Sequence, residues 1–411
     1  MMTATRTVRP RPDSPGGSVD GAQPAAWSRR KMLRVVGFGA ATVLVAGAGA
    51  LSYRVFDTAV LDPGGGDAYA PWRSWRDTPG PLGAVAAAVL AASPHNTQPW
   101  IFGVGADAID VYVDRTRTTG TVDPFGREQY VGLGCAVENL VLGCRARGLE
   151  PSVAWLPDGA DGDRVAHVAL VAGPAVASPL YDAIGERHTN RGPYDGRPVP
   201  NDLLSAFIGD AVPAGIAVQW ITEAAARAAL GALLVDAATA LTADEQQSAD
   251  GFGWFRGSND EVQRYRDGLV LDGQGLGPLT LGAAKLLPAS SRSAGDEFWV
   301  EQTRSVHTAT AAAYGVITAI HPEERRTQLE AGRLLQRIHL AATTQGVALQ
   351  HMNQITERID REAAIGAVPT SAPQFAALLP DGGAPLLTFR IGYPVRAARP
   401  TPRRDVAEVT R

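Results

Sequence analysis

The chain has 411 residues, 45% of them hydrophobic, and a formal net charge of −4. This length exceeds what one hydrophobic core usually encloses, so two domains or two fused modules are expected. Residues 1–54 are basic and the remainder is correspondingly acidic. Nucleic acid is therefore excluded as an expected partner, because neutralising its phosphates needs a basic face.

Residues 1–54 have the pattern of an export signal. Arg29 and Arg30 precede an uncharged run, residues 35–53, that is rich in Gly and Ala. Paired arginines before a moderately apolar run are typical of the twin-arginine route, so we expect the export machinery as a partner and a location in the cell envelope or beyond the cytoplasm. The alternative is an uncleaved membrane anchor, since residues 35–53 are long enough, as a helix, to cross the hydrocarbon core.

A linker rich in Gly and Trp, residues 55–78, leads to a first module at residues 79–178. The spacing of apolar residues predicts, in order, a helix at 82–91, a strand at 109–114, a helix at 130–147, and strands at 152–156 and 165–171. Cys135 and Cys144 lie on the longer helix, too far apart along its axis for a disulfide, and are expected as buried core thiols.

The second module is expected at residues 179–411. The pattern predicts a helical start at 179–185, helices at 201–207, 223–239, 296–320 and 322–344, and strands at 216–221 and 386–393. Residues 251–294 are rich in Gly, Ser and charge and carry several aromatic side chains, which favours a long excursion from the module. This excursion is either a lid over a site or a surface insertion whose aromatic side chains pack on the body.

A stiff polar loop joins the first helix to the strand that follows it. Pro94 and Pro99 restrain the backbone, and Ser93, Asn96 and Gln98 are among the polar side chains that it presents. Such a loop is typical of small-molecule sites, although it is also compatible with an ordinary connection. Residues 211–219 are weakly similar to residues 92–100, but their polar side chains are replaced by apolar or small ones. This similarity indicates an internal duplication in which one copy kept the polar loop.

A charged turn at residues 186–191 is the second candidate. Arg187 and Arg191 are four positions apart with Thr189 between them, and two guanidiniums so spaced can converge on one phosphate. The alternative is a solvated charged turn. Arg403 and Arg404, after the last strand, form a third basic element that by itself reads as surface.

Other chemistry is not indicated. No group of His, Cys or carboxylate residues has zinc-site spacing, so no metal is expected. Gly273, Gly275 and Gly277 lack the strand–helix context of a dinucleotide loop. His167, His307, His321 and His339 lie in separate expected elements and are assigned to structure or solvation.

Together the three motifs resemble the nitroreductase-like FMN flavoprotein family, in particular its exported, internally duplicated Acg-type branch. The resemblance covers roughly residues 82–409. The segments that carry it are residues 93–100, 186–191, 198–200, 346–350, 392–394 and 402–404. It implies an α+β, nitroreductase-like fold of two fused modules that mimic the family homodimer, each a mostly antiparallel sheet with packed helices.

The resemblance also implies an FMN site. The phosphate would be held by Arg187, His188, Thr189, Arg191 and Arg403 or Arg404. Ser93, Asn96 and Gln98 would lie near the flavin ring, and Gln350, His351 and Met352 would approach it from another side. No catalytic protein residue is expected, because the flavin carries the chemistry. No lysine is expected to assist, since Lys31 and Lys285 are the chain's lysines.

The function implied is an FMN-dependent oxidoreductase that takes electrons from NAD(P)H or another reductant and passes them to a nitroaromatic, a quinone or a similar small-molecule acceptor. Two alternatives stay open: a protein that binds or sequesters FMN with little turnover, and a flavin-consuming enzyme of the same fold. Because the second module takes the place of a partner subunit, we expect a monomer with one FMN per chain.

Overall fold

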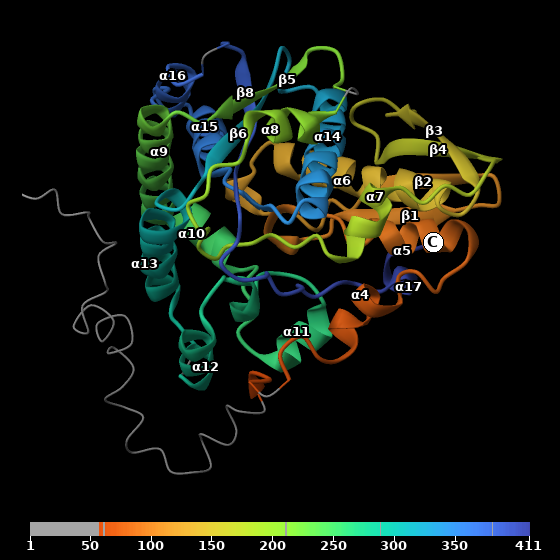
Figure 1. The fold of residues 1–411 in the computed structure, drawn as a ribbon, viewed down its shortest axis with the longest axis horizontal. Helices are drawn as coiled ribbons and strands as arrows, with labels where there is room; N and C mark the ends of the chain where they lie inside the picture. Colours follow the sequence, from red (N-terminus) through yellow and green to blue (C-terminus); the bar gives the residue numbers. More distant parts are fainter. Residues whose placement is uncertain (1–56, 61, 210–211, 288, 380) are drawn as a thin grey trace, which may run out of the picture.

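The computed structural model describes residues 57–60, 62–209, 212–287, 289–379 and 381–411. The predicted export or anchor segment lies outside these residues, as does Ala211 at the start of the predicted second copy of the loop. Within them, two four-stranded antiparallel sheets are covered by helices, which confirms the predicted α+β class (Figure 1).

The first sheet has the strand order β1-β2-β4-β3. Its strands are β1 (Trp100–Val104), β2 (Ala108–Val113), β3 (Leu149–Trp155) and β4 (Arg164–Ala172). In β2 the side chains of Ile109, Val111 and Val113 are buried in strict alternation, as expected for a sheet with one face on a core. Helices α5 (Gly80–Ala88) and α6 (Arg127–Arg145) cover that face and bury an almost continuous set of small and apolar residues.

The second sheet has the same order, β5-β6-β8-β7. Its strands are β5 (Ile216–Ile221), β6 (Ala313–Ala319), β7 (Ala348–His351) and β8 (Ala384–Gly392). Its α14 (Arg325–Thr344) joins β6 to β7 as α6 joins β2 to β3. Further helices of this module are α7 (Pro179–Asp182), η4 (Ala183–Gly185), α8 (Asn201–Ile208), α9 (Ala224–Ala243), α15 (Gln354–Ala364), α16 (Ser371–Ala376) and α17 (Val406–Val409).

Helices α6 and α14 pack against each other at two glycines. A Cβ atom on Gly134 would lie 2.0 Å from the carbonyl oxygen of Leu329, and one on Gly332 would lie 2.1 Å from that of Val131. The separation from Gly134 to Gly332 equals that from Val131 to Leu329, so the contact is reciprocal between equivalent helices. The modules therefore meet as two subunits of a symmetric dimer would.

One predicted helix is wrong. Residues 296–320 were expected as a single helix, but they contain the end of α13 (Arg292–Gln302), the π-helical turn η6 (Thr303–Thr308) and the central strand β6. Every residue of β6 is buried, so its sequence is a continuous apolar run without a period of two. Such a run does not distinguish a strand from a buried helix. The short strand β7 was also not predicted.

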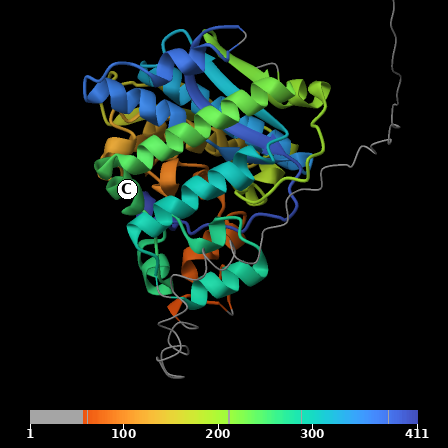
Figure 2. The ribbon, with the colours of Figure 1, turned by 90° about the vertical axis from the view of Figure 1, so that its left-hand side faces the viewer.

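The excursion at residues 251–294 is largely helical. It holds α11 (Asn259–Tyr265), η5 (Leu271–Gly273) and α12 (Pro278–Leu286), between the end of α10 (Glu245–Phe252) and the start of α13. A capping box between Ser258 and Glu261 starts α11, a signal that is visible in the sequence. Figure 2 shows these helices below the sheets, beside the short N-terminal helices η1 (Asp67–Tyr69) and α4 (Ala70–Ser74).

Two further features bear on the predictions. Cys135 and Cys144 are buried free thiols, as expected. Among the described residues, α9 is the one helix long and apolar enough to cross a membrane. Its Leu230, Leu233 and Leu234 pack in a core cluster with side chains of α15 and α16, and packing inside the second module accounts for these apolar residues.

Candidate functional site

The polar loop between α5 and β1 is held in an uncommon backbone conformation. It contains the 3-10 turn η2 (Pro94–Asn96), and three of its non-glycine residues have positive φ: 45° at His95, 57° at Asn96 and 51° at Gln98. Left-handed conformations are unfavourable for such side chains and persist where surrounding contacts enforce them, often at functional sites.

Those contacts come from the excursion and from the C-terminal tail. The Asn96 amide nitrogen donates to the carbonyl oxygens of Gly268, at 3.2 Å, and Pro402, at 2.9 Å. Gln98 donates to the carbonyl oxygen of Arg266 at 2.8 Å, and its side-chain oxygen accepts from the backbone N–H of Arg404 at 2.8 Å. Ser93 accepts from the backbone N–H of Gln98 at 3.1 Å. The loop thus joins two segments that lie far away in the sequence.

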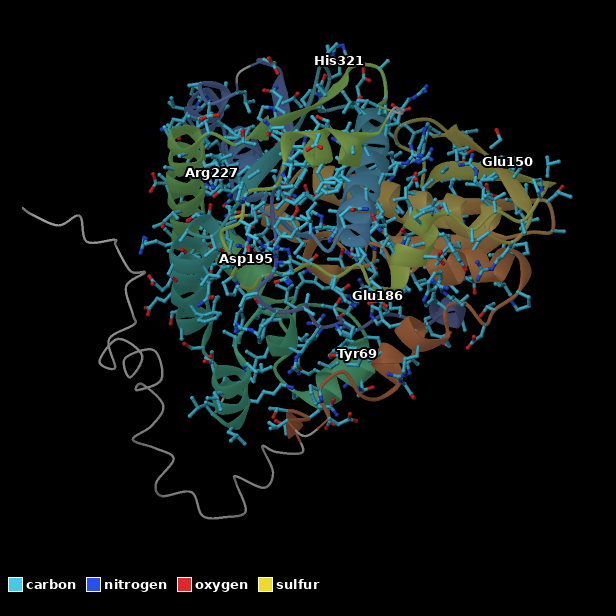
Figure 3. The ribbon with its side chains drawn as sticks, in the orientation of Figure 1. Tyr69, Glu150, Glu186, Asp195, Arg227 and His321 are labelled. Atoms are coloured by element: carbon cyan, nitrogen blue, oxygen red, sulfur yellow. The ribbon has the colours of Figure 1, made fainter. Side chains whose placement is uncertain are left out.

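The predicted arginine turn is buried, not solvated. The side chain of Arg187 is 2% exposed; it donates to the carbonyl oxygen of Leu90 at 3.0 Å, and its Nε has no hydrogen-bond partner. Arg191 donates to the carbonyl oxygen of Gly273, in the excursion, at 3.2 Å. The carboxylate of the turn, Glu186, is exposed to solvent and labelled in Figure 3. It therefore provides no buried counter-charge.

Arg403 brings the tail to the same place. Its guanidinium donates to Asn96 Oδ1 and Thr401 Oγ1, both at 2.6 Å, and to the carbonyl oxygen of Ala91 at 3.2 Å. Its Nε, like that of Arg187, is buried without a partner. The backbone N–H of Arg403 donates to the carbonyl oxygen of Ala68 at 2.8 Å, which ties the tail to the N-terminal helices.

These groups line a cavity that is partly open to solvent, with about 460 Å³ of empty space when that open part is included. Seven residues predicted for the site line it: Ser93, Asn96, Arg187, His188, Thr189, Arg191 and Arg403. The excursion adds Leu269, Val270, Gly273 and Gln274, and the other lining residues are Ala92, Arg399 and Thr401. None of these lining residues is acidic. The nearby Asp272 is already bound by Lys285, at 2.6 Å, and by Arg399, at 3.4 Å.

Burial of like charges shifts the pKa values around the cavity. Burial, with no carboxylate near, lowers the pKa of Arg187 to about 10, and burial with the charge of Arg390 lowers that of Arg191 to about 10. Burial and the charges of Arg187 and Arg403 lower the pKa of His188 to about 3. All these shifts disfavour positive charge, because burial penalises the charged forms and, at Arg191 and His188, neighbouring guanidiniums repel them as well.

Five predicted site residues lie outside the cavity lining. Gln98 and Arg404 are hydrogen-bonded to each other and do not line the cavity. Gln350 accepts from Arg390 Nε at 2.7 Å, and Met352 lies in a core cluster. His351 is behind the arginine turn, where burial and the charges of Arg187 and Arg191 lower its pKa to about 3, and its Nε2 has no partner. β7 thus supports the turn from behind.

Sequence reasoning missed the contribution of the segment before α5. Tyr69 and Trp72, in the region predicted as a linker, pack with Val262 and Val270 of the excursion. Tyr69 is labelled in Figure 3, in the same lower part of the molecule as Glu186. The aromatic residues of the segment were a signal for packing, but nothing local indicated what they pack against.

Two fused α+β modules with an arginine cavity whose lining has no carboxylate agree with the resemblance to the nitroreductase-like proteins that the motifs indicate. No protein-family model matches the chain. It is 29% identical over 334 residues to the protein named "Putative NAD(P)H nitroreductase Rv3131" of Mycobacterium tuberculosis, with 78% of this chain and 88% of the relative covered. It is 24% identical over 332 residues to the M. tuberculosis protein named "Putative NAD(P)H nitroreductase acg", with 79% and 93% covered. The predicted resemblance to the Acg-type branch is therefore confirmed.

Solved nitroreductase structures match a smaller part of the chain. The FMN-dependent nitroreductase NfnB from Mycobacterium smegmatis in complex with NADPH is 18% identical, with 57% of this chain and 97% of that chain covered and a TM-score of 0.33. A nitroreductase with bound FMN from Desulfitobacterium hafniense is 17% identical, with 57% and 99% covered and a TM-score of 0.35.

Proposed function

We propose that the chain is an FMN-dependent oxidoreductase that takes electrons from NAD(P)H and passes them to a nitroaromatic, a quinone or a similar small acceptor. The observation that supports the cofactor is the cavity itself. The buried Arg187 and Arg403 and the partly buried Arg191 bring three guanidiniums together, and no carboxylate lines the cavity. Burying such charges unpaired is costly, so the cavity fits an anionic ligand.

The phosphate of FMN fits the unpaired donors. Arg187 Nε and Arg403 Nε are buried N–H groups with no protein acceptor, and charge-assisted bonds to a phosphate would satisfy both. The Thr189 hydroxyl also lines the cavity and can donate. Ser93 and Asn96 also line the cavity, and we propose that they lie near the flavin ring. When bound, FMN supplies two-electron redox chemistry.

The chain's own contribution is to bind, orient and exclude water. The stiff loop of the first module and the arginine turn of the second both line the cavity, so neither module holds the site alone. We propose the module division 79–178 and 179–411, with residues 251–294 as the lid. The names of the relatives support NAD(P)H as the reductant.

The test begins with the purified full chain. We expect a yellow protein with about one FMN per chain, bleached by NADPH or NADH and reoxidised by a nitroaromatic compound. Arg187→Met with Arg191→Met should abolish FMN occupancy, because two phosphate ligands are lost. Arg197→Ala, in an exposed pair with Asp195, is the matched control and should retain FMN. Normal occupancy in the double variant would show that the phosphate site is wrong.

A second candidate function, FMN sequestration, has an observation of its own. The excursion is fastened over the loop by Asn96 and Gln98, and its Gly273 carbonyl oxygen already accepts from Arg191. A lid closed so firmly would slow the access of substrates. Flavin that stays bound and oxidised with either nicotinamide present would favour this candidate over the oxidoreductase. A loss of flavin absorbance that reoxidation does not restore would favour a flavin-consuming enzyme.

We further propose that residues 1–54 direct export by the twin-arginine route. The support is the sequence pattern of Arg29 and Arg30 before an apolar run. Replacing Arg29 and Arg30 by Lys in the full chain should leave the protein in the cytoplasmic fraction. Unchanged export of that variant would contradict the twin-arginine route.

A further inference from the structure

Trp72, on α4, lies directly behind the cavity and touches two of its lining side chains. The Cζ atom of Arg403 is 4.8 Å from the centre of the indole ring, over its face. The imidazole of His188 meets the indole edge-on, with ring centres 4.4 Å apart and planes at 65°. The indole is partly buried and is not itself among the residues that line the cavity.

The indole is fixed by a hydrogen bond of its own. Trp72 Nε1 donates to the carbonyl oxygen of Thr401 at 2.7 Å, and the hydroxyl of Thr401 accepts from Arg403 at 2.6 Å. One aromatic side chain therefore orders the tail at Thr401 and supports the guanidinium two residues later. The backbone N–H of Arg403 also bonds to Ala68, one turn before Trp72, so this short N-terminal stretch holds Arg403 at both ends.

The electrostatic setting favours such support, which adds to the hydrogen bonds from Arg403 to Asn96, Thr401 and Ala91. Arg403 shares the cavity with Arg187 and Arg191, so repulsion would drive an untethered guanidinium toward solvent. The negative face of an indole ring attracts a guanidinium, and this attraction strengthens where water is excluded. A neutral imidazole packs beside the indole without adding charge, and burial with the nearby arginines keeps the pKa of His188 near 3.

We propose that Trp72 is a positioning residue of this cavity: it holds Arg403 and His188 in place for the phosphate end of the ligand. The predicted linker thus supports two lining side chains of the site from behind them. This inference rests on the proposed function where FMN is the ligand, and it extends to any phosphate-bearing ligand of the same cavity.

The experiment compares FMN with riboflavin, which lacks the phosphate, on the full chain and its variants. Trp72→Leu removes the aromatic face and should weaken FMN binding about tenfold, the usual size of one such contact, while the Kd of riboflavin changes less than twofold. Trp72→Phe keeps a ring face and should restore FMN binding to within about threefold of the wild type. A merely structural role would weaken both ligands alike.

Trp75→Leu is the matched control. Trp75 lies three residues further on, packs on Tyr181 at 5.0 Å and carries the guanidinium of Arg76 at 4.7 Å, but touches no cavity-lining arginine. It should not change the ratio of the FMN and riboflavin Kd values. Equal losses for both ligands in Trp72→Leu, no loss of FMN affinity, or the same loss in Trp75→Leu would each overturn the inference.

A second measurement separates this inference from the proposed function. Inorganic phosphate should raise the melting temperature of the flavin-free wild type, and Trp72→Leu should reduce that rise while Trp75→Leu does not. If the wild type binds phosphate but not FMN, the proposed function fails and the role of Trp72 is still decided. If phosphate has no effect on the wild type, both fail.

Discussion

Arg187 and Arg390 are both fully buried guanidiniums, yet their surroundings differ. Arg390 donates to the carbonyl oxygens of His307, at 3.0 Å, and Gly192, at 2.6 Å, and lies over the ring of Tyr194. Arg187 has one carbonyl acceptor, a buried imidazole nitrogen at 3.4 Å and an unpaired Nε. Arg390 is thus a structural residue, and Arg187 is one whose pairing is incomplete without a ligand.

This contrast predicts opposite effects on stability. Arg187→Met should raise the stability of the flavin-free protein by about 1 kcal/mol or more, because an unpaired buried charge is removed. Arg390→Met should lower it by about 3 kcal/mol or more, because several buried acceptors lose their donor. Urea unfolding of the two variants measures both. A loss of stability in Arg187→Met as large as in Arg390→Met would contradict the idea of an incomplete site.

The buried imidazoles predict a pH dependence. Burial lowers the pKa of His95 to about 4, and burial with nearby arginines lowers those of His188 and His351 to about 3. At these three side chains the unfolded chain binds more protons than the folded chain between about pH 3 and pH 6.5, so their contribution to stability rises with pH through this window. Burial raises the pKa of Glu357 to about 7, and this carboxyl acts in the opposite direction. The melting temperature of a His188→Phe variant should therefore fall less from pH 7 to pH 5 than that of the wild type, both free of flavin. Bound phosphate should reduce the fall, because an anion favours protonated imidazoles.

Among the elements, the crossing of α6 and α14 is the tightest contact. Gly332→Ala would place a methyl group against the carbonyl oxygen of Val131 and should destabilise the protein by about 1–3 kcal/mol. Gly282→Ala in α12, where a Cβ meets nothing within 4 Å, should be neutral or stabilising. Thermal unfolding compares them. Equal stability of the two variants would show that the modules do not need this close approach.

The excursion is fastened to the loop by a buried carboxylate. Asp267 pairs with Arg117, which also donates to the carbonyl oxygen of Thr97, and with Arg256 at 2.7 Å. If the excursion is a lid, Asp267→Asn should speed FMN release several-fold, measured by trapping the released flavin with excess apoflavodoxin. Asp163→Asn, which breaks an exposed pair with Arg115, is the control. An unchanged release rate would favour a surface insertion.

The elements with a clear period or clear end signals could be predicted from the sequence. Strand β5 has the predicted bounds, and α6 and α14 agree to within about three residues at each end. Strand β6 could not be predicted, because tertiary burial on both faces erased its alternation. For the site, the residues at 187–191 and 403 were predicted through motifs. Trp72 was not, because its importance arises from contacts with residues more than a hundred positions away.

At the scale of the molecule, the reciprocal packing of the modules leads to a prediction of oligomeric state. A chain that carries both halves of a symmetric dimer needs no second copy to complete the cavity. We expect a monomer with one FMN per chain, measured by light scattering together with flavin absorbance. Two FMN per chain, or FMN binding that depends on dimerisation, would contradict a single retained site.

The hydrogen bond from Arg403 to Asn96 spans 307 positions of sequence. During synthesis the loop and the arginine turn are made long before Arg403. A nascent chain that ends before Arg403 therefore cannot hold the complete cavity. The last contacts to form also carry the largest loop-closure entropy, which makes them a late step of folding. FMN binding would then require a fully translated and folded chain. A prematurely terminated product would lack Arg403, would not bind FMN and would therefore be colourless.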